Sequence, residues 1–378
     1  MHIASLPPDI SPLVPTEEES SPFFLNGSLN WTTYPEFRMT ASCTPLPLID
    51  LRSEKEFALG HVPGSVNLPL LANDERAQVG TLYKTEGKIP AVQLALELFA
   101  QKAPQFLESI NDLTANNHQV GLYCWRGGMR SSMVGMWLAS MGFKAFLLLG
   151  GYKRYRHFVL AELEKLAQHP LIVLNGRTGS GKSDLLRTLR HDHEVTAIID
   201  FEALACHKGS AFGDFGEKTP CPSQQQFENL IVERYLPISS APRILVEIEN
   251  FIGPVALPLP LRNSIIASPM VLLSRDFDDR VERLIKEYTS DWGQEIEIRF
   301  EDRMKLLSKH LSKDLYEQII VAVRNKNFKD AVSLLLSVHY DRLYDKSIMR
   351  YSKNVIAEFN LTTQIKDSIS FLLTALNA

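Results

Sequence analysis

Two short stretches of the sequence combine glycines with side chains that bind anions, and each directly follows an apolar run. The first is YCWRGGMRSS (123–132), which holds one cysteine, two arginines and two adjacent glycines. The second is NGRTGSGKS (175–183), which has a lysine before its last serine and no cysteine. The sequence therefore predicts two anion-binding loops, of which only the first can also supply a thiol nucleophile.

The first stretch has the composition of a turn between a strand and a helix N-terminus. At such a turn, backbone N–H groups and the helix dipole converge on one point, which favours a bound anion and a nucleophilic thiolate. Cys124 occupies this point, and Gly127 and Gly128 allow the backbone to curl around it. Arg126 and Arg130 offer fork-shaped donors for an oxyanion. We therefore expect the cysteine and both arginines to be catalytic, with the thiol accessible to a substrate; a buried, inert cysteine is the alternative.

The second stretch matches the phosphate-binding pattern G-x-x-x-x-G-K-[ST] in full, between the apolar run LIVLN and the helical pattern SDLLRTLR. Backbone N–H groups of such a loop surround a diphosphate, the lysine pairs with its oxygens, and the final hydroxyl can bind Mg²⁺. ATP, GTP or another diphosphate ester fits the same loop. The predicted binding residues are Gly176, Arg177, Thr178, Gly179, Ser180, Gly181, Lys182 and Ser183.

Two glutamates follow a later apolar run, in VEIENFIG (246–253). A nucleotide-binding enzyme keeps the acid that positions its metal ion at the end of such a strand. Alternation along the strand places Glu247 and Glu249 on the same face. We expect both to contribute to the phosphate-binding site, with a simple ion pair as the alternative.

Length and composition are those of a soluble protein with more than one domain. The chain has 378 residues, of which 45% are hydrophobic and 22% charged, enough for two or three cores. No apolar run approaches the roughly 18 residues of a membrane helix, and the start lacks the pattern of a secretory signal. The four cysteines form no C-x-x-C pair. We therefore predict a cytoplasmic protein with neither a membrane partner nor a metal-binding cluster.

Short apolar runs alternate with helical patterns in two series, which is typical of parallel sheets with crossover helices. We expect strands at 45–50, 66–69, 118–124 and 145–151, and then at 171–176, 197–204, 243–250 and 270–275. The expected organisation is a flexible tail over 1–44, a first α/β domain over 45–160, a phosphate-binding α/β domain over 168–275, and a helical C-terminal region over 276–378.

The stretch LIDLRSEKEFALGHVPGSVNLP (48–69), taken with the cysteine loop, resembles a rhodanese domain. The resemblance places Asp50, Arg52 and Asn67 in the first motif of that family, and implies a loop cysteine that carries sulfur or selenium. The spacing Cys-x5-Arg is one residue longer than in the usual sulfurtransferase loop and resembles phosphatases of the same fold. A wider loop suits a tetrahedral phosphoryl or selenophosphate group. Tyr123 stands where those phosphatases have histidine.

A rhodanese-like sheet domain followed by a P-loop NTPase-like sheet domain, with a helical C-terminal region, resembles the tRNA 2-selenouridine synthases. The resemblance extends over about residues 46–345. Besides the two loops and VEIENFIG, it rests on LPLLANDERAQVGTLYKTEGK (68–88), DFEALACHKGSAFG (200–213), QQFENLI (225–231) and HYDRLYD (339–345). The sequence departs from the family pattern at Ile248, Asn250 and Phe251.

This resemblance implies a transferase that replaces sulfur by selenium in the wobble 2-thiouridine of tRNA. The family alkylates the sulfur with geranyl diphosphate and takes selenium from selenophosphate, so no tightly bound cofactor is expected, although Mg²⁺ can assist. An S-alkylated sulfur leaves as a thiolate, whereas a thiocarbonyl sulfur is a poor leaving group. The scheme assigns the prenyl diphosphate to the P-loop and selenium to the loop of Cys124.

Contacts with tRNA are expected from basic clusters near the C-terminus and from one aromatic ring. The clusters are Arg280, Arg283 and Lys286; Arg299, Arg303, Lys305 and Lys309; and Arg324, Lys326 and Lys329. Trp125 is a candidate for stacking on the flipped wobble base. His207, Lys208 and Gly209 are candidates for the wall of the P-loop site.

Two other functions are compatible with the same residues. One is a P-loop kinase or NTPase fused to a Cys-x5-Arg phosphatase. The other is non-catalytic, with a rhodanese-like regulatory module on a nucleotide-dependent RNA-binding switch. Cys124 argues against the second alternative, because an inactive module needs no thiol.

Overall fold

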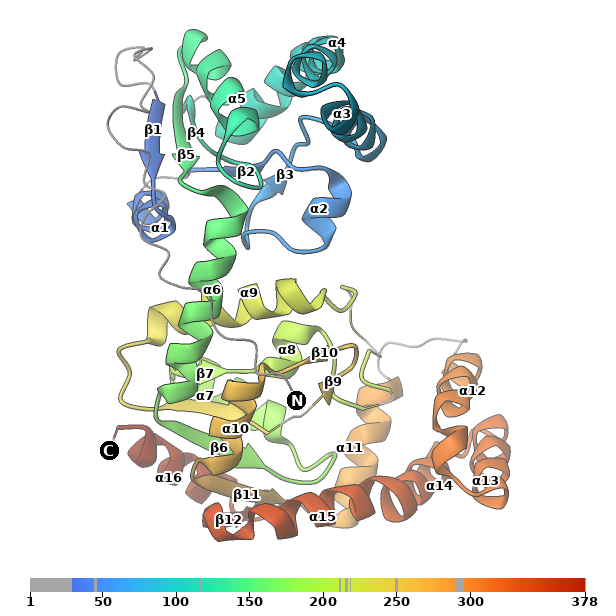
Figure 1. Cartoon of the computed structure of the whole chain (residues 1–378). Coiled ribbons are helices and arrows are strands. Elements are labelled where there is room, and N and C mark those ends of the chain that lie inside the picture. The colour runs from blue at the N-terminus through green and yellow to red at the C-terminus, as the bar shows by residue number, and fades with distance from the viewer. Residues whose placement is uncertain are drawn as a thin grey trace, which may run out of the picture. The chain divides into compact units, whose positions relative to one another are not determined.

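The computed structural model describes residues 29–43, 46–115, 117–210, 212–214, 217, 219–248, 251–289 and 296–377. These residues divide into two compact units. The first contains the described residues up to Glu54 together with Gly64–Arg154, and the second contains Lys55–Pro63 and the residues from Tyr155 onward. Figure 1 shows a sheet flanked by helices in each unit.

The sheet of the first unit is parallel and has the strand order β1-β5-β4-β2-β3. Its strands are β1 (Leu29–Thr32), β2 (Leu48–Asp50), β3 (Val66–Asn67), β4 (Gln119–Tyr123) and β5 (Lys144–Leu148). The middle strands read as continuous apolar runs because helices cover both faces of a parallel sheet. This arrangement confirms the α/β prediction for the first half of the chain.

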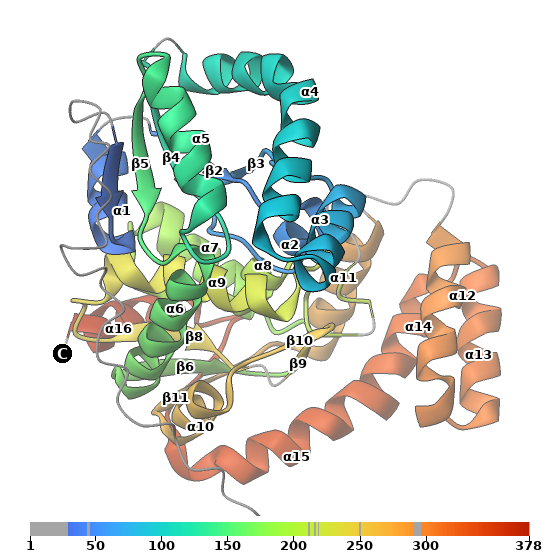
Figure 2. The same cartoon turned by 45° about the horizontal axis from the view of Figure 1, so that its top comes forward.

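The helices of the first unit are α1 (Tyr34–Cys43), α3 (Asn73–Thr85), α4 (Lys88–Thr114), α5 (Met129–Ser140) and the start of α6 (Gly151–Gln168), while α2 (Glu54–Ala58) begins at the unit boundary. Helices α3 and α4 pack against each other. Side chains such as Leu71, Phe106 and Val134 join the sheet residues in one buried core. Figure 2 shows α3, α4 and α5 around one side of this sheet.

The sheet of the second unit is also parallel and has the order β12-β11-β6-β8-β7. Its strands are β6 (Leu171–Asn175), β7 (Ile198–Ile199), β8 (Ile244–Glu247), β11 (Met270–Ser274) and β12 (Val355–Asn360), and a separate hairpin pairs β9 (Phe251–Ile252) with β10 (Val255–Ala256). All five residues of β6 are buried. The central strand β6 therefore leads directly into the glycine-rich stretch.

Helices surround this second sheet and continue beyond it. They are α7 (Lys182–Asp192), α8 (Phe201–Ala205), α9 (Gln224–Tyr235), α10 (Leu259–Ala267), α11 (Phe277–Thr289), α12 (Ile296–Leu307), α13 (Lys313–Arg324), α14 (Phe328–Leu334), α15 (Asp341–Tyr351) and α16 (Ile365–Asn377). Phe300, Ile319 and Ala331, from α12, α13 and α14, belong to a core of their own. The predicted helical character of the C-terminal region is thus largely observed.

Three expectations from the sequence need correction. The strand expected over 197–204 is limited to β7 (Ile198–Ile199), because Phe201–Ala205 form α8, whose N-cap Asp200 accepts from the N–H of Ala203. The flexible tail predicted over 1–44 is wrong for residues 29–43, because β1 pairs with β5 and is followed by α1. Residues 1–28 lie outside the described part of the chain. In the region 276–378, where only helices were expected, β12 pairs with the edge of β11. Its first five residues alternate between half-buried and exposed and none of its six is fully buried, so the strand leaves only a weak signal in the sequence.

Within the described ranges, no helix is both long enough and apolar enough to cross a lipid bilayer.

Candidate functional sites: a cysteine loop and a phosphate-binding loop

The cysteine loop lies between β4 and α5, as predicted. Strand β4 ends at Tyr123, and α5 begins at Met129, with Gly128 as its N-cap. The Cys124 side chain is buried, with 3% of the residue exposed, and its Sγ lies 3.4 Å from Oγ of Ser131. The thiol is therefore less accessible than expected, but its neighbour is a hydroxyl group in the first turn of a helix.

The backbone of this loop packs tightly against the start of α6. Gly127 and Gly151 both have positive φ, at 62° and 58°. A Cβ atom on Gly151 would lie 2.3 Å from the carbonyl oxygen of Cys124. The N–H of Tyr152 donates to that same carbonyl at 2.9 Å, and the next amide donates to the carbonyl of Trp125 at 2.9 Å. The shape of the loop thus depends on close approach between two backbone segments.

The residues of the rhodanese-like first motif support the sheet beneath the loop. Asp50 and Arg52 are both buried and form an ion pair at 2.5 Å. The Arg52 guanidinium lies 3.8 Å from the ring centre of Tyr152, and Asn67 donates to the carbonyls of both paired residues. Burial raises the pKa of Tyr123 well above its ordinary value. That side chain is a neutral hydrogen-bonding group, which does not replace the histidine of the phosphatase pattern.

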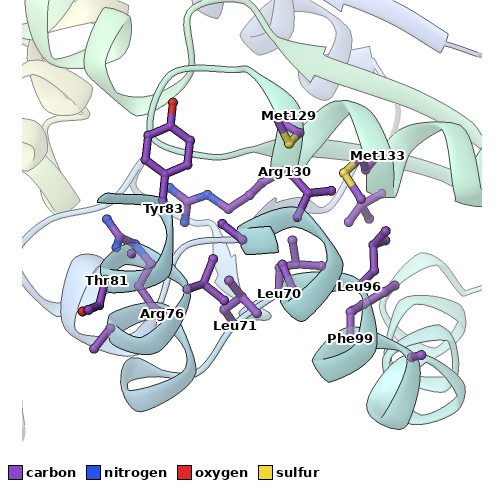
Figure 3. A pocket seen from close by; sticks show the side chains of 18 of the residues that line it. Leu70, Leu71, Arg76, Thr81, Tyr83, Leu96, Phe99, Met129, Arg130 and Met133 are labelled. Carbon is purple, nitrogen blue, oxygen red and sulfur yellow. The ribbon is translucent and has the colours of Figure 1, made fainter. Parts of the chain in front are cut away.

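The two arginines of the cysteine loop lie on the wall of a large cavity. Arg126 is exposed, and Arg130 is half-buried in the first turn of α5. Both line a hollow of about 1270 Å³ that continues along α3 and α4. In Figure 3, Arg130 extends toward the side of the hollow on which Tyr83 stands. Trp125 has 37% of its surface exposed and lies 5.9 Å from the ring of Tyr152, so it remains available for stacking.

The phosphate-binding loop runs from the end of β6 to the start of α7. Gly179 and Gly181 have φ values of 77° and 97°, which a side chain would disfavour. Lys182 is buried, with 8% exposed. Its Nζ donates to the carbonyl of Gly176 at 2.9 Å and lies 5.4 Å from the ring centre of Tyr344. The lysine is therefore folded back onto its own loop.

Ion pairs with α15 hold the same loop from outside. Arg177 donates to Asp345 at 2.6 and 2.9 Å. The side chain of Arg280 donates to Asp341 at 2.5 and 3.0 Å and to the carbonyl of Thr178 at 3.0 Å. These contacts bring together segments that are more than 60 residues apart in the chain.

The buried hydroxyl Oγ of Ser180 has no hydrogen-bond partner in the described part of the chain. The backbone carbonyl of the same residue accepts from Nε of Arg275 at 3.2 Å. A buried polar atom that faces no partner in a phosphate-binding loop is consistent with a site that a ligand completes.

Two carboxylates lie next to the end of the loop. The hydroxyl of Ser183 donates to Oε2 of Glu202 at 3.1 Å, and the backbone N–H of Glu202 donates to Oε1 of Glu247 at 3.1 Å. Glu247 is fully buried and pairs in register with Leu174 of β6. Glu249 lies outside the described residues. The structure therefore brings Glu247 to the phosphate-binding loop through Glu202.

Comparison with known proteins agrees with this geometry. A model of the rhodanese-like domain matches residues 36–157, and a model described as the tRNA 2-selenouridine synthase AAA domain matches residues 169–370. The tRNA 2-selenouridine synthase of Shewanella sp. (strain ANA-3) is 34% identical over 344 residues, which are 82% of this chain and 91% of that protein. This chain belongs to the tRNA 2-selenouridine synthase family.

Other members of the tRNA 2-selenouridine synthase family align over different lengths. The protein of Sulfurovum sp. (strain NBC37-1) is 33% identical over 83% of this chain and 92% of its own length. The protein of Nitrosomonas eutropha (strain DSM 101675 / C91 / Nm57) is 38% identical, but the alignment covers 64% of this chain and 63% of that relative. The chain thus spans less than two thirds of the length of this last relative.

Five residues of the basic clusters in this synthase-family chain form ion pairs with carboxylates. Arg280 is buried against Asp341, so the prediction that it faces tRNA is wrong. The other pairs are Arg283 with Asp184, Arg303 with Asp214, Arg324 with Glu301, and Lys305 with Asp302. The Arg299 side chain lies outside the described residues. Lys286, Lys309, Lys326 and Lys329 are exposed.

Several residues of the site were not predicted from the sequence. The partner of Cys124, Ser131, lies in the first turn of α5. Glu202, Asp341 and Asp345 lie in stretches that carry the resemblance to the synthase family, DFEALACHKGSAFG and HYDRLYD. Those stretches were the available signal for the carboxylates, but they did not reveal which side chain each one contacts.

The histidine predicted at the P-loop has a packing role. His207 is 9% exposed, and its ring lies against Gly213 and Gly253, where a Cβ would come within 2.6 Å of it. Its Nδ1 accepts the N–H of Gly209 at 3.1 Å. Burial lowers the pKa of the imidazole. The ring thus holds its surrounding loops together as a neutral group.

Proposed function

We propose that this chain converts the wobble 2-thiouridine of tRNA into 2-selenouridine in two steps, with geranyl diphosphate and selenophosphate as substrates. The observation that supports this most strongly is the presence of a thiol loop and a diphosphate-binding loop on one chain of the tRNA 2-selenouridine synthase family. A kinase fused to a phosphatase would also have two loops, but it would have no reason to share this family's sequence over most of its length.

The first step uses the phosphate-binding loop. The sulfur of 2-thiouridine attacks C1 of geranyl diphosphate, the C–O bond breaks, pyrophosphate leaves, and the ring nitrogen N3 loses its proton. The backbone N–H groups of the loop and the ammonium of Lys182 neutralise the charge that develops on the leaving group. The lysine donates to the Gly176 carbonyl of its own loop. It must give up this contact to pair with a phosphate oxygen of a diphosphate bound in that loop.

The side chains at the end of this loop fit a magnesium ion. Mg²⁺ prefers hard oxygen ligands and keeps several of its waters. The hydroxyl of Ser183 and the carboxylates of Glu202 and Glu247 supply such oxygens in a connected chain of hydrogen bonds. When bound, the ion would add positive charge beside the diphosphate, with Ser183 as its direct protein ligand.

The second step uses the cysteine loop. The thiolate of Cys124 attacks the phosphorus of selenophosphate, the P–Se bond breaks, and hydrogen selenide is released beside the base. Selenium then adds to C2 of the S-geranylated ring, and the C–S bond breaks as geranyl thiolate leaves. Water hydrolyses the phosphocysteine to phosphate. No oxidation state changes, so this route needs no external reductant, unlike a perselenide on the cysteine.

The arginines and the loop amides have defined tasks in this second step. Arg126 and Arg130 would hold the phosphoryl oxygens, as fork-shaped donors do for tetrahedral anions. The start of α5 adds its backbone N–H groups and the positive end of its dipole next to the cysteine. The hydroxyl of Ser131, 3.4 Å from the sulfur, can hydrogen-bond to the thiolate before attack.

The experiment that tests the proposed function is mass spectrometry of tRNA nucleosides from cells with and without this chain. Cells with the chain and a selenium supply are expected to contain 2-selenouridine, and cells with the chain but without selenium to accumulate S-geranyl-2-thiouridine. Deletion should remove both nucleosides and leave 2-thiouridine. Identical nucleoside pools in both strains would refute the proposed function.

A further inference from the structure

The roles proposed for the two anion-binding loops leave a large apolar cavity of the first unit without a function. It lies between α3, α4 and α5 and has a volume of about 1270 Å³, somewhat above the roughly 300–1,000 Å³ of pockets for small molecules. Leu71, Val92, Leu96, Phe99 and Met133 are among its mainly apolar lining side chains. Figure 3 shows Leu71, Leu96, Phe99 and Met133 around this hollow. The volume and the apolar lining of the cavity suit an extended apolar group.

The cavity begins at the cysteine loop. Arg126, Met129 and Arg130 line it, and they are the second, fifth and sixth residues after Cys124. An apolar group inside the cavity would therefore have one end beside the residues that carry the selenium chemistry. A general hydrophobic surface would not be connected to the reaction in this way. Here the reacting atoms at the cysteine loop determine where one end of a bound group must lie.

The charged residues of the cavity wall are all basic. They are Arg76, Lys84, Arg126 and Arg130, and no aspartate or glutamate lines the cavity in the part of the chain that the structure describes. Basic side chains around an apolar interior favour a molecule with an apolar part attached to an anionic part. A prenylated nucleotide within an RNA chain has this composition.

We propose that this cavity binds the geranyl chain of S-geranyl-2-thiouridine in tRNA while selenium replaces the sulfur. The inference rests on the proposed function, because that function requires the geranyl thiolate to leave from C2 beside Cys124. The geranyl group is attached to the sulfur that departs, so the first carbon of that group must lie next to the cysteine loop. The cavity is the apolar space that starts there.

Binding of the geranyl group in the cavity also ensures that geranylation precedes selenium exchange. Each methylene transferred from water to an apolar pocket strengthens binding by about fourfold, so the geranylated base is retained much more strongly than the unmodified one. The cavity would thus select the activated base for selenium exchange. It also gives the departing geranyl thiol an apolar space in which to separate from the RNA.

The test measures binding of the full-length protein to two anticodon stem-loop RNAs without a selenium donor. One RNA carries S-geranyl-2-thiouridine at the wobble position, and the other carries S-methyl-2-thiouridine. We expect the protein to bind the geranylated RNA at least tenfold more tightly. Leu96→Asp should remove this preference, because Leu96 lines the cavity and is 45% exposed, which makes the substitution compatible with folding.

One further variant controls for folding and for general effects of charge, and another repeats the test. Ile89→Asp changes an apolar residue of the same helix that is 74% exposed and lies outside the cavity, so it should keep the preference for the geranylated RNA. Tyr83→Asp, on α3 across the cavity, repeats the test at a residue that is 57% exposed. It should lose the preference as Leu96→Asp does.

Three results would overturn the assignment. The first is equal affinity of the wild-type protein for both RNAs. The second is an equal loss of both affinities in Leu96→Asp, which would indicate a general RNA surface. The third is an impaired geranylation step with intact binding of geranylated RNA, which would place the free prenyl diphosphate in the cavity. Because this assay needs no turnover, failure with a wild-type protein that still selenates geranylated RNA removes only the cavity assignment. Absence of that conversion removes the proposed function.

Discussion

The cysteine loop and the phosphate-binding loop start from the same architecture but are held in place by different forces. Each follows a buried strand of a parallel sheet and leads into a helix. The cysteine loop is held by backbone contacts, in which the amides of Tyr152 and Lys153 donate to its carbonyls. The phosphate-binding loop is held by the ion pairs of Arg177 and Arg280 with carboxylates of α15.

Because the two loops are held in place differently, the arginines near them have different roles. In the phosphate-binding loop, Arg177 and Arg280 are engaged by Asp345 and Asp341, so the proposed diphosphate would be bound by the loop's own amides and lysine. In the cysteine loop the backbone contacts fix the shape, and the arginines lie on the wall of a cavity. Similar strand–loop–helix sequences can therefore have different sensitivities to substitution.

The largest effect on stability is expected where a buried ion pair is broken. Asp341→Asn leaves the guanidinium of Arg280, which is 2% exposed, without its carboxylate. Breaking such a pair costs about 3–5 kcal/mol in the free energy of unfolding. Urea denaturation of the wild type and the variant measures this loss directly.

A matched control uses an exposed pair in the same unit. Asp302→Asn removes the partner of Lys305, where both side chains are more than 60% exposed, and should leave the denaturation midpoint nearly unchanged. Equal midpoints for Asp341→Asn and the wild type would mean that ion pairs do not hold the phosphate-binding loop.

A smaller effect is expected from adding one methyl group to the backbone contact of the cysteine loop. In Gly151→Ala, the new Cβ would lie 2.3 Å from the carbonyl oxygen of Cys124 and from the amide nitrogen of Gly127, at a φ of 58°. We expect a loss of about 2–3 kcal/mol, together with loss of selenium transfer. Thermal unfolding and a selenation assay measure the two effects.

Gly142→Ala is the control for Gly151→Ala. It introduces the backbone strain of a positive φ without a close contact between the new Cβ and other atoms. Gly142 has a φ of 89°, and a Cβ there would meet nothing within 4 Å. It should therefore cost only the roughly 1–2 kcal/mol of the left-handed conformation and should keep selenation. If both alanine variants behaved alike, close packing of the two backbone segments would not explain the loop.

The smallest effect concerns the pH dependence of stability in the second unit. Burial lowers the pKa of His207 below its ordinary value of 6.5, while Asp214 acts in the opposite direction. Since the folded protein favours the neutral ring, its contribution to stability is present above pH 6.5 and decreases as the pH falls toward the lowered pKa.

Thermal unfolding at pH 7.5 and pH 5.5 checks this sign with His207→Gln, which does not titrate. The loss of stability between the two pH values should be smaller in the variant than in the wild type. An identical loss in both proteins would show that the neutral imidazole, whose Nδ1 accepts from Gly209, has no part in it.

The sequence predicted the order of elements well because buried strands and loop glycines leave local signals. The stretches around Cys124 and Lys182 fold as expected, between β4 and α5 and between β6 and α7. The partners of these loops were harder to predict. Asp345 lies 168 residues from Arg177, and nothing in the local pattern of either residue indicates the other.

Charge patterns were the least reliable part of the sequence analysis. Arg280 has the helical spacing of a solvated face, yet it is buried because Asp341 and the Thr178 carbonyl satisfy its donors. The strand β12 was missed because it lies at a sheet edge and follows a long run of helices. In each case a tertiary contact, absent from any short window of sequence, determined the outcome.

The division of labour between the two loops is tested most directly by measuring the two half-reactions separately in two variants. One assay follows geranylation of a 2-thiouridine RNA, and the other follows selenation of an RNA that is already geranylated. Lys182→Ala is expected to slow geranylation by about 10²–10³-fold and to spare selenation, whereas Cys124→Ala should do the reverse. Loss of selenation with intact geranylation in Lys182→Ala would contradict the account.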